Sequence, residues 1–128
     1  GTADTFKAAL YLASATVNAS TTAYSSTGEV TGTGYTAGGV TVTNATPPAS
    51  TNTSSTAGTA YWTPSASITY TTVTLTTAFD CVLIYNSTQS NKAVSVHTFG
   101  SQTVTAGTFT LTMPSNTTST ALLRLATT

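Results

Sequence analysis

Threonine is the residue that most constrains how this chain can fold, because it occupies 35 of the 128 positions. Its β-branched side chain packs well on a pleated surface and so favours strands. Hydrophobic residues make up 39% of the chain and the formal net charge is zero. Disordered chains instead combine low hydrophobicity with high net charge. The sequence therefore predicts an all-β fold rather than a disordered linker.

Charged side chains are scarce, and their scarcity excludes several classes of function. Three cations and three anions are scattered along the chain, so no basic patch can neutralise a phosphate backbone and we expect no nucleic-acid partner. The longest apolar run, residues 81–85, is far too short to span a bilayer, and from the first residues we expect no signal peptide. One cysteine and one histidine can form neither an intrachain disulfide nor a zinc site, so we expect no metal and no cofactor.

Alternation of apolar and polar residues divides the chain into about seven to eight short antiparallel strands separated by polar turns. This pattern is typical of a β-sandwich, Ig-like or jelly-roll-like, in a single domain spanning residues 1–128. We expect the Ser/Thr/Pro-rich segment 46–58 to be an exposed loop or arm, and Gly100 to turn the chain. The apolar parity shifts between Tyr70 and Val73, which indicates a bulge or bend there. Strands are expected over residues 6–12, 40–43, 68–77, 79–85, 93–99, 104–113 and 121–126.

Four glycines lie within eight residues, at Gly32, Gly34, Gly38 and Gly39. Such a density implies left-handed backbone or a close approach of another backbone, and we expect a positive φ at Gly34 or Gly38. No lysine follows the segment, and a threonine-valine strand comes next, so it is not a phosphate-binding loop. We interpret these four glycines as a structural turn.

Catalytic chemistry has few candidate residues. His97 is the only imidazole, and a triad would need Asp80 or Asp4 to orient it and a serine or Cys81 as nucleophile. No G-x-S-x-G elbow exists, so a surface or interface histidine is the stronger interpretation. Glu29 and Asp4 are too isolated in the sequence to predict a carboxylate pair. We therefore expect no catalytic residues and no enzymatic activity.

Cys81 lies in the near-continuous apolar run 79–85, which is the best candidate for a central strand. By alternation it shares a face with Phe79 and Leu83, whereas His97 lies opposite Val94 and Val96, which are expected to face inward. An inert, buried thiol is the expected state of such a cysteine.

Aromatic side chains are the remaining candidates for recognition. Trp62 and the six tyrosines could stack on sugar rings, but core or interface positions are the favoured interpretation. We name Tyr11, Tyr35 and Trp62 as possible interface residues.

The glycine segment carries a resemblance to a known group of proteins. Residues 29–39 read E-V-T-G-T-G-Y-T-A-G-G, similar to the E-V-x-G-x-G-Y-x-x-G-G segment of small structural proteins of tailed bacteriophages. Residues 82–88 resemble a strand that follows in that group, and residues 99–100 and 107–111 resemble its phenylalanine-glycine turn and final hairpin. The resemblance spans roughly residues 29–111, with a gap at the proline loop, and implies a virion component without a catalytic role.

The resemblance and the low charge together lead us to expect a non-enzymatic virion structural protein. The first expectation is a capsid decoration or cement protein that binds the outer surface of a tailed-phage head after synthesis in the host bacterial cytoplasm. Its partner would be the major capsid protein or another virion protein, and we expect a homo-oligomer, with a trimer favoured. The alternatives are a tail, neck or fibre component and a carbohydrate-binding surface module.

Overall fold

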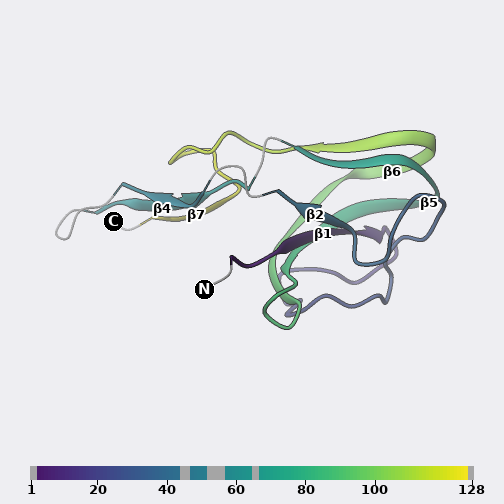
Figure 1. Cartoon of the computed structure of the whole chain (residues 1–128), viewed down its shortest axis with the longest axis horizontal. Coiled ribbons are helices and arrows are strands. Elements are labelled where there is room, and N and C mark those ends of the chain that lie inside the picture. Colours follow the sequence, from purple (N-terminus) through teal and green to yellow (C-terminus); the bar gives the residue numbers. More distant parts are fainter. Residues whose placement is uncertain (1–2, 44–46, 52–56, 65–66, 127–128) are drawn as a thin grey trace. The chain divides into compact units, whose positions relative to one another are not determined.

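The computed structural model describes residues 3–43, 47–51, 57–64 and 67–126 (Figure 1). Within these ranges the chain has no helix and is 56% strand, which confirms the all-β prediction. The Ig-like or jelly-roll-like arrangement stays a prediction. The strands are β1 (Phe6–Leu12), β2 (Val40–Val42), β3 (Ala49–Ser50), β4 (Thr59–Trp62), β5 (Ser67–Asn86), β6 (Lys92–Thr112) and β7 (Leu123–Ala126).

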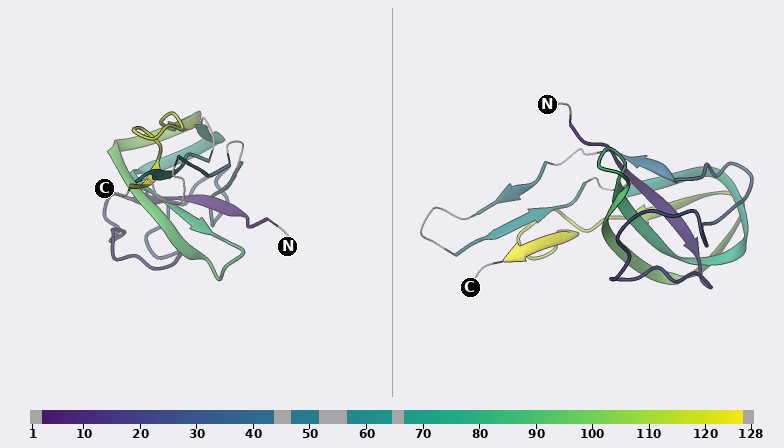
Figure 2. Two further views of the ribbon diagram at one scale, coloured as in Figure 1. Left: turned by 90° about the vertical axis from the view of Figure 1, so that its left-hand side faces the viewer. Right: turned by 90° about the horizontal axis from the view of Figure 1, so that it is seen from below.

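The chain divides into two compact units, and the single domain expected from the sequence stays a prediction. The first unit comprises residues 1–42 and 69–110, and the second comprises residues 43–68 and 111–128. The first unit holds a four-stranded antiparallel sheet in the order β2-β1-β5-β6, and the second a three-stranded antiparallel sheet in the order β3-β4-β7 (Figure 2).

The core of the first unit lies around its two inner strands, β1 and β5. In β1 the consecutive residues 8–11 are each at most 1% exposed, so the strand is covered on both faces. In β5 the run 81–85 is buried in the same way, which confirms the expected central strand. One face is covered because Ala15, Val17 and Tyr24, from the loop after β1, pack against the cluster that contains Tyr11.

One irregularity in β5 lies where the sequence predicted it. The buried positions change from Tyr70 to Val73, so the parity shifts, and Thr72 between them has a φ of 50°. The predicted bulge or bend is therefore confirmed. It keeps apolar side chains on the core side of a strand that would otherwise turn them to solvent.

A second irregularity in β5 overturns part of the sequence analysis. Tyr11 pairs with Cys81 but Leu12 pairs with Phe79, which leaves Asp80 as an extra residue. Because neighbouring residues of β1 point to opposite faces, Phe79 and Cys81 do so too. The expectation that they share a face is wrong. A near-continuous apolar run hides such a bulge, because its apolar residues occupy both odd and even positions.

The two faces of this sheet consequently carry different side chains. Cys81 packs with Leu83 on one face, and the partly buried Ala93 and Val96 pack against the same cluster. On the other face the rings of Phe79, Phe99 and Phe109 pack edge-on or tilted, with centroids 5.0–6.0 Å apart.

β5 and β6 are much longer than the predicted strands, at 20 and 21 residues. Gly100 does not turn the chain but lies within β6, where no atom is within 4 Å of the position that a Cβ would take. Glycine permits a turn without requiring one, and pairing along β5 keeps the strand extended. The expected loop 46–58 also contains β3; its residues 46 and 52–56 lie outside the described part of the chain.

Candidate functional site

Glu29 is a buried carboxylate, 6% exposed, held by three uncharged donors. Its Oε1 accepts hydrogen bonds from the Tyr35 hydroxyl at 2.7 Å and the Gly38 backbone amide at 2.7 Å. Its Oε2 accepts one from the Tyr24 hydroxyl at 2.6 Å. Hydrogen bonds to an ionised acceptor are short and strong, and they offset the loss of water around a buried charge. We call this group of four residues the Glu29 clamp.

The backbone around Glu29 is fixed along the outer edge of β1. Glu29 forms an isolated antiparallel bridge with Tyr11, and the Val30 amide donates to the Leu10 carbonyl at 3.0 Å. The Leu12 amide donates to the Gly28 carbonyl at 2.9 Å. The segment 28–30 therefore continues the edge that β2 occupies further along β1, and this pairing directs the Glu29 side chain to its donors.

Tyrosine hydroxyls extend the clamp into the sheet. The Tyr35 hydroxyl also accepts from the Leu10 amide at 3.0 Å, so it links the carboxylate directly to β1. The Tyr85 hydroxyl donates to the Gly38 carbonyl at 2.8 Å, and its ring stacks on Tyr24 with centroids 4.8 Å apart. Two further hydroxyls donate to backbone carbonyls, Tyr70 to Ala8 and Tyr11 to Ser25.

The glycine segment has the backbone that the sequence predicted. The φ angles of Gly34, Gly38 and Gly39 are 81°, 89° and 76°, so the expected positive φ is confirmed at both Gly34 and Gly38. Gly32 serves the other purpose, close approach, because a Cβ there would lie 2.0 Å from the Thr74 carbonyl oxygen. The segment thus lets the backbone at Gly32 pack closely on the backbone at Thr74, and it places the Gly38 amide within hydrogen-bond distance of Glu29.

The predicted interface residues lie mostly inside the chain. Tyr11 is 1% exposed and Trp62 is 8% exposed, while Tyr35 is half-buried in the Glu29 clamp. A side chain packed within its own unit offers little surface to another protein. Their role at an interface stays a prediction that a single chain does not test.

His97 is half-buried rather than fully exposed, and burial lowers its pKa. Its Nε2 is buried without a hydrogen-bond partner among the described residues, and so is the Oγ of Ser95 two positions earlier. Both atoms belong to residues of β6.

Cys81 is 4% exposed. Burial raises the pKa of its thiol, and the negative charge of Asp80 adds a smaller effect in the same direction. A protonated thiol in an apolar cluster is a poor nucleophile. We expect the folded protein to resist thiol labelling at neutral pH and to react fully once denatured. Mass spectrometry of the labelled protein measures this. Rapid labelling of the native protein would contradict the assignment of a buried, protonated thiol.

Alkaline pH is expected to unfold the first unit through its tyrosines. Burial raises the pKa of Tyr11 to about 12, and burial with the bond to Glu29 raises the pKa values of Tyr24 and Tyr35. The unfolded chain loses protons above the ordinary tyrosine value of 10.0, whereas the folded chain keeps them. The contribution of these tyrosines to the free energy of unfolding is therefore fully present below that pH. Above it, each such tyrosine lowers the free energy of unfolding by about 1.4 kcal/mol per pH unit.

Denaturant titrations at increasing pH, with tyrosinate absorbance recorded in parallel, test the alkaline prediction. The midpoint should stay constant up to the ordinary tyrosine pKa and then fall steeply, and the tyrosines should ionise together with unfolding. Gradual ionisation of all tyrosines in a protein that remains folded would show that the hydroxyls are not held as described.

The arrangement of the Glu29 clamp is suited to holding the fold rather than to chemistry. The carboxylate has its oxygens occupied by internal donors, and the described residues contain no group of three or more His, Cys, Asp or Glu side chains that could hold a metal ion. Sequence reasoning missed Glu29. The signal that could have found it is the glutamate placed six residues before a tyrosine and nine before a glycine, within the segment that carries the phage resemblance.

Comparison with known proteins finds no protein-family model, no curated protein and no solved structure that matches this chain. In the described ranges, no helix is long and apolar enough to cross a membrane.

Proposed function

We propose that this chain is a non-enzymatic structural protein of a tailed-bacteriophage virion that decorates the outer surface of the head. The observation that carries the proposal is the use made of residues 29–39, the segment that resembles phage structural proteins. Its glutamate, tyrosine and glycines are committed to hydrogen bonds and close contacts inside the first unit. Side chains and backbone groups held in this way support a rigid domain, which is what a structural role requires.

The second unit supplies the surface that we assign to contact with the capsid lattice. A shallow hollow of about 290 Å³ lies there, lined by Pro48, Tyr61, Trp62 and the leucines of β7, and Leu125 is 73% exposed. Arg124 also lines the hollow and is the one charged residue in the sequence of this unit. A nearly uncharged apolar surface can meet many identical sites without like-charge repulsion. Binding only the assembled lattice would stabilise it by mass action.

Self-association is part of the same proposal. A closed homo-oligomer, with a trimer first if the protein sits on three-fold axes of the head, matches a chain of zero net charge. Sedimentation at micromolar concentration measures this directly. A strict monomer, both alone and on the particle, would contradict the oligomer.

The decisive experiment locates the chain on particles. In virions purified from cells that produce it, we expect the chain to copurify and to be imaged on the head surface. Leu125→Ser should lower its occupancy about tenfold, because burying a leucine contributes about 1.5–3 kcal/mol. Ala37→Ser, a change at an exposed site in the first unit, is the matched control and should bind normally. Density on the tail, neck or fibre would favour that alternative, and absence from virions would refute the proposal.

Carbohydrate binding has weaker support. Trp62, the ring best suited to stacking on sugars, is only 8% exposed, and the hydroxyls of five tyrosines bond inside the first unit. Glycan-array binding that Trp62→Ala abolishes would nevertheless favour this alternative over a virion role.

A further inference from the structure

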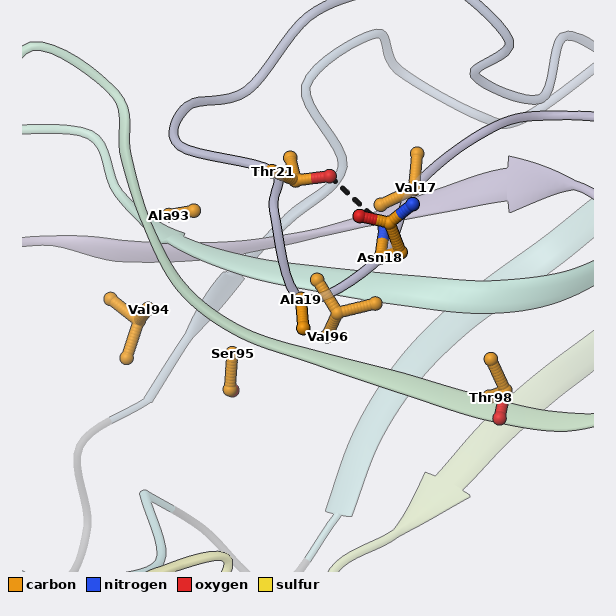
Figure 3. A pocket seen from close by; sticks show the side chains of 9 residues that line it. All are labelled: Val17, Asn18, Ala19, Thr21, Ala93, Val94, Ser95, Val96 and Thr98. Atoms are coloured by element: carbon orange, nitrogen blue, oxygen red, sulfur yellow. Dashed lines mark hydrogen bonds between the residues drawn. The ribbon is translucent and has the colours of Figure 1, made fainter.

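A hollow of about 590 Å³ lies beside β6 in the first unit (Figure 3). One wall is the loop segment 17–21, and the other is formed by residues 93–96 and Thr98 of β6. None of the lining side chains is charged. Consecutive strand residues normally point to opposite faces, so a hollow lined by four in a row runs along the edge of the strand. Its volume is within the range of ligand-binding clefts.

β6 is an edge strand, and the loop pairs only with its beginning. The Tyr24 amide donates to the Asn91 carbonyl at 2.9 Å, and the Ala93 amide donates to the Thr22 carbonyl at 2.9 Å. A turn at residues 18–21, closed by the Thr21 amide on the Asn18 carbonyl at 2.9 Å, then takes the loop away from the strand. The hollow occupies the place where the loop would have continued this pairing.

The pairing at the start of β6 shows which backbone groups face the hollow. In an antiparallel ladder the N–H and C=O of alternate residues point to the same neighbour. Because the Asn91 carbonyl and the Ala93 amide point to the loop, Ser95 and His97 present their backbone groups on that side. Beyond Ala93, no strand in the described part of the chain pairs with this edge. The Ser95 Oγ and the His97 Nε2 are also buried without hydrogen-bond partners in the described part of the chain, and of these two residues Ser95 lines the hollow.

We propose that an extended, uncharged peptide segment of a partner protein adds to this sheet along Ser95–His97, between β6 and the loop segment 17–21. Strands in a sheet are about 4.8 Å apart, and the unpaired backbone groups would supply the hydrogen bonds of a fifth strand. The walls select the side chains. Val17 and Val96 favour small or β-branched residues, and a charged residue would enter without a counterion.

The chemistry of the hollow favours a polypeptide over a sugar. None of its lining residues is aromatic, so no ring is available for stacking, whereas a row of backbone donors and acceptors matches another main chain. An unpaired edge strand is a template that proteins usually cover or block. This inference goes beyond the proposed virion role, because a partner segment can be bound in this way wherever the protein acts.

Hydrogen exchange measured by NMR on the full chain tests strand addition. The probe is a capped peptide of about seven alternating threonines and valines, the length of a typical strand. We expect it to slow exchange of the Ser95 and His97 amides about tenfold, while the same peptide with alternate amides N-methylated, or with lysine in place of threonine, has no effect. Equal protection by the N-methylated peptide, or no protection by any peptide, would overturn the proposal.

A variant that fills the hollow provides a second, independent test of strand addition. Ala19→Trp adds a bulky ring at an exposed loop position on its wall, and it should abolish the protection without changing the unfolding midpoint. Ala37→Trp, at another exposed loop position of the same unit, is the matched control and should bind the peptide normally. Undiminished protection in Ala19→Trp, or amide shifts with maltose and none with the peptide, would also overturn the proposal. None of these outcomes bears on whether the chain is found on virions.

Discussion

Replacing Glu29 with alanine is expected to destabilise the first unit by about 4 kcal/mol. The change leaves the hydroxyls of Tyr24 and Tyr35 and the amide of Gly38 without their acceptor. A hydrogen bond to a charged group contributes about 1.5–3 kcal/mol, and a stranded buried donor loses about as much. Since whole domains are stable by only about 5–15 kcal/mol, much of the stability should disappear. Urea unfolding followed by near-ultraviolet circular dichroism measures the change.

Two further variants separate the charge of Glu29 from its shape. Glu29→Gln keeps one carbonyl oxygen as acceptor and turns an NH₂ group toward a hydroxyl that can accept, so we expect a loss of about 1–2 kcal/mol. Asp80→Asn alters a half-buried carboxylate outside the clamp and should change stability by about 0.5 kcal/mol or less. An alanine variant as stable as the native chain would show that the clamp does not support the fold.

Local pattern was sufficient to predict the all-β character, the central strand and its core, but not the short strands β3 and β4. The apolar run 81–85 is buried because a strand with no polar face fits only the middle of a sheet, and β5 lies between β1 and β6. The parity shift between Tyr70 and Val73 was visible because polar residues mark the other face on either side of it. Positive φ at Gly34 and Gly38 followed from glycine density alone.

The candidate site and the strand lengths needed information that local pattern does not contain. A glutamate among polar loop residues reads as exposed, and only the pairing of residues 28–30 with β1 shows that Glu29 turns inward. The bulge at Asp80 lies near the start of an apolar run, where no alternation of apolar and polar residues is available to assign side chains to the two faces. Gly100 read as a turn because local preference cannot register the pairing with β5 that keeps β6 extended. The hollow beside β6 likewise depends on where a distant loop leaves the sheet.

Gly39→Ala is expected to be the most damaging single substitution of the glycine segment, with a loss of more than about 4 kcal/mol. Gly39 has a φ of 76°, and an added Cβ would lie 1.8 Å from the carbonyl oxygen of Ala8 and 2.8 Å from the Cα of Ala9. Both atoms belong to the backbone of the central strand β1, so neither can move without breaking the sheet. Gly100→Ala is the matched control, since its Cβ meets nothing within 4 Å and alanine in a strand interior is favoured over glycine by about 0.5–1 kcal/mol. The urea midpoint should therefore fall for Gly39→Ala and rise for Gly100→Ala. Equal midpoints would show that the structure accommodates a Cβ at Gly39 without losing stability.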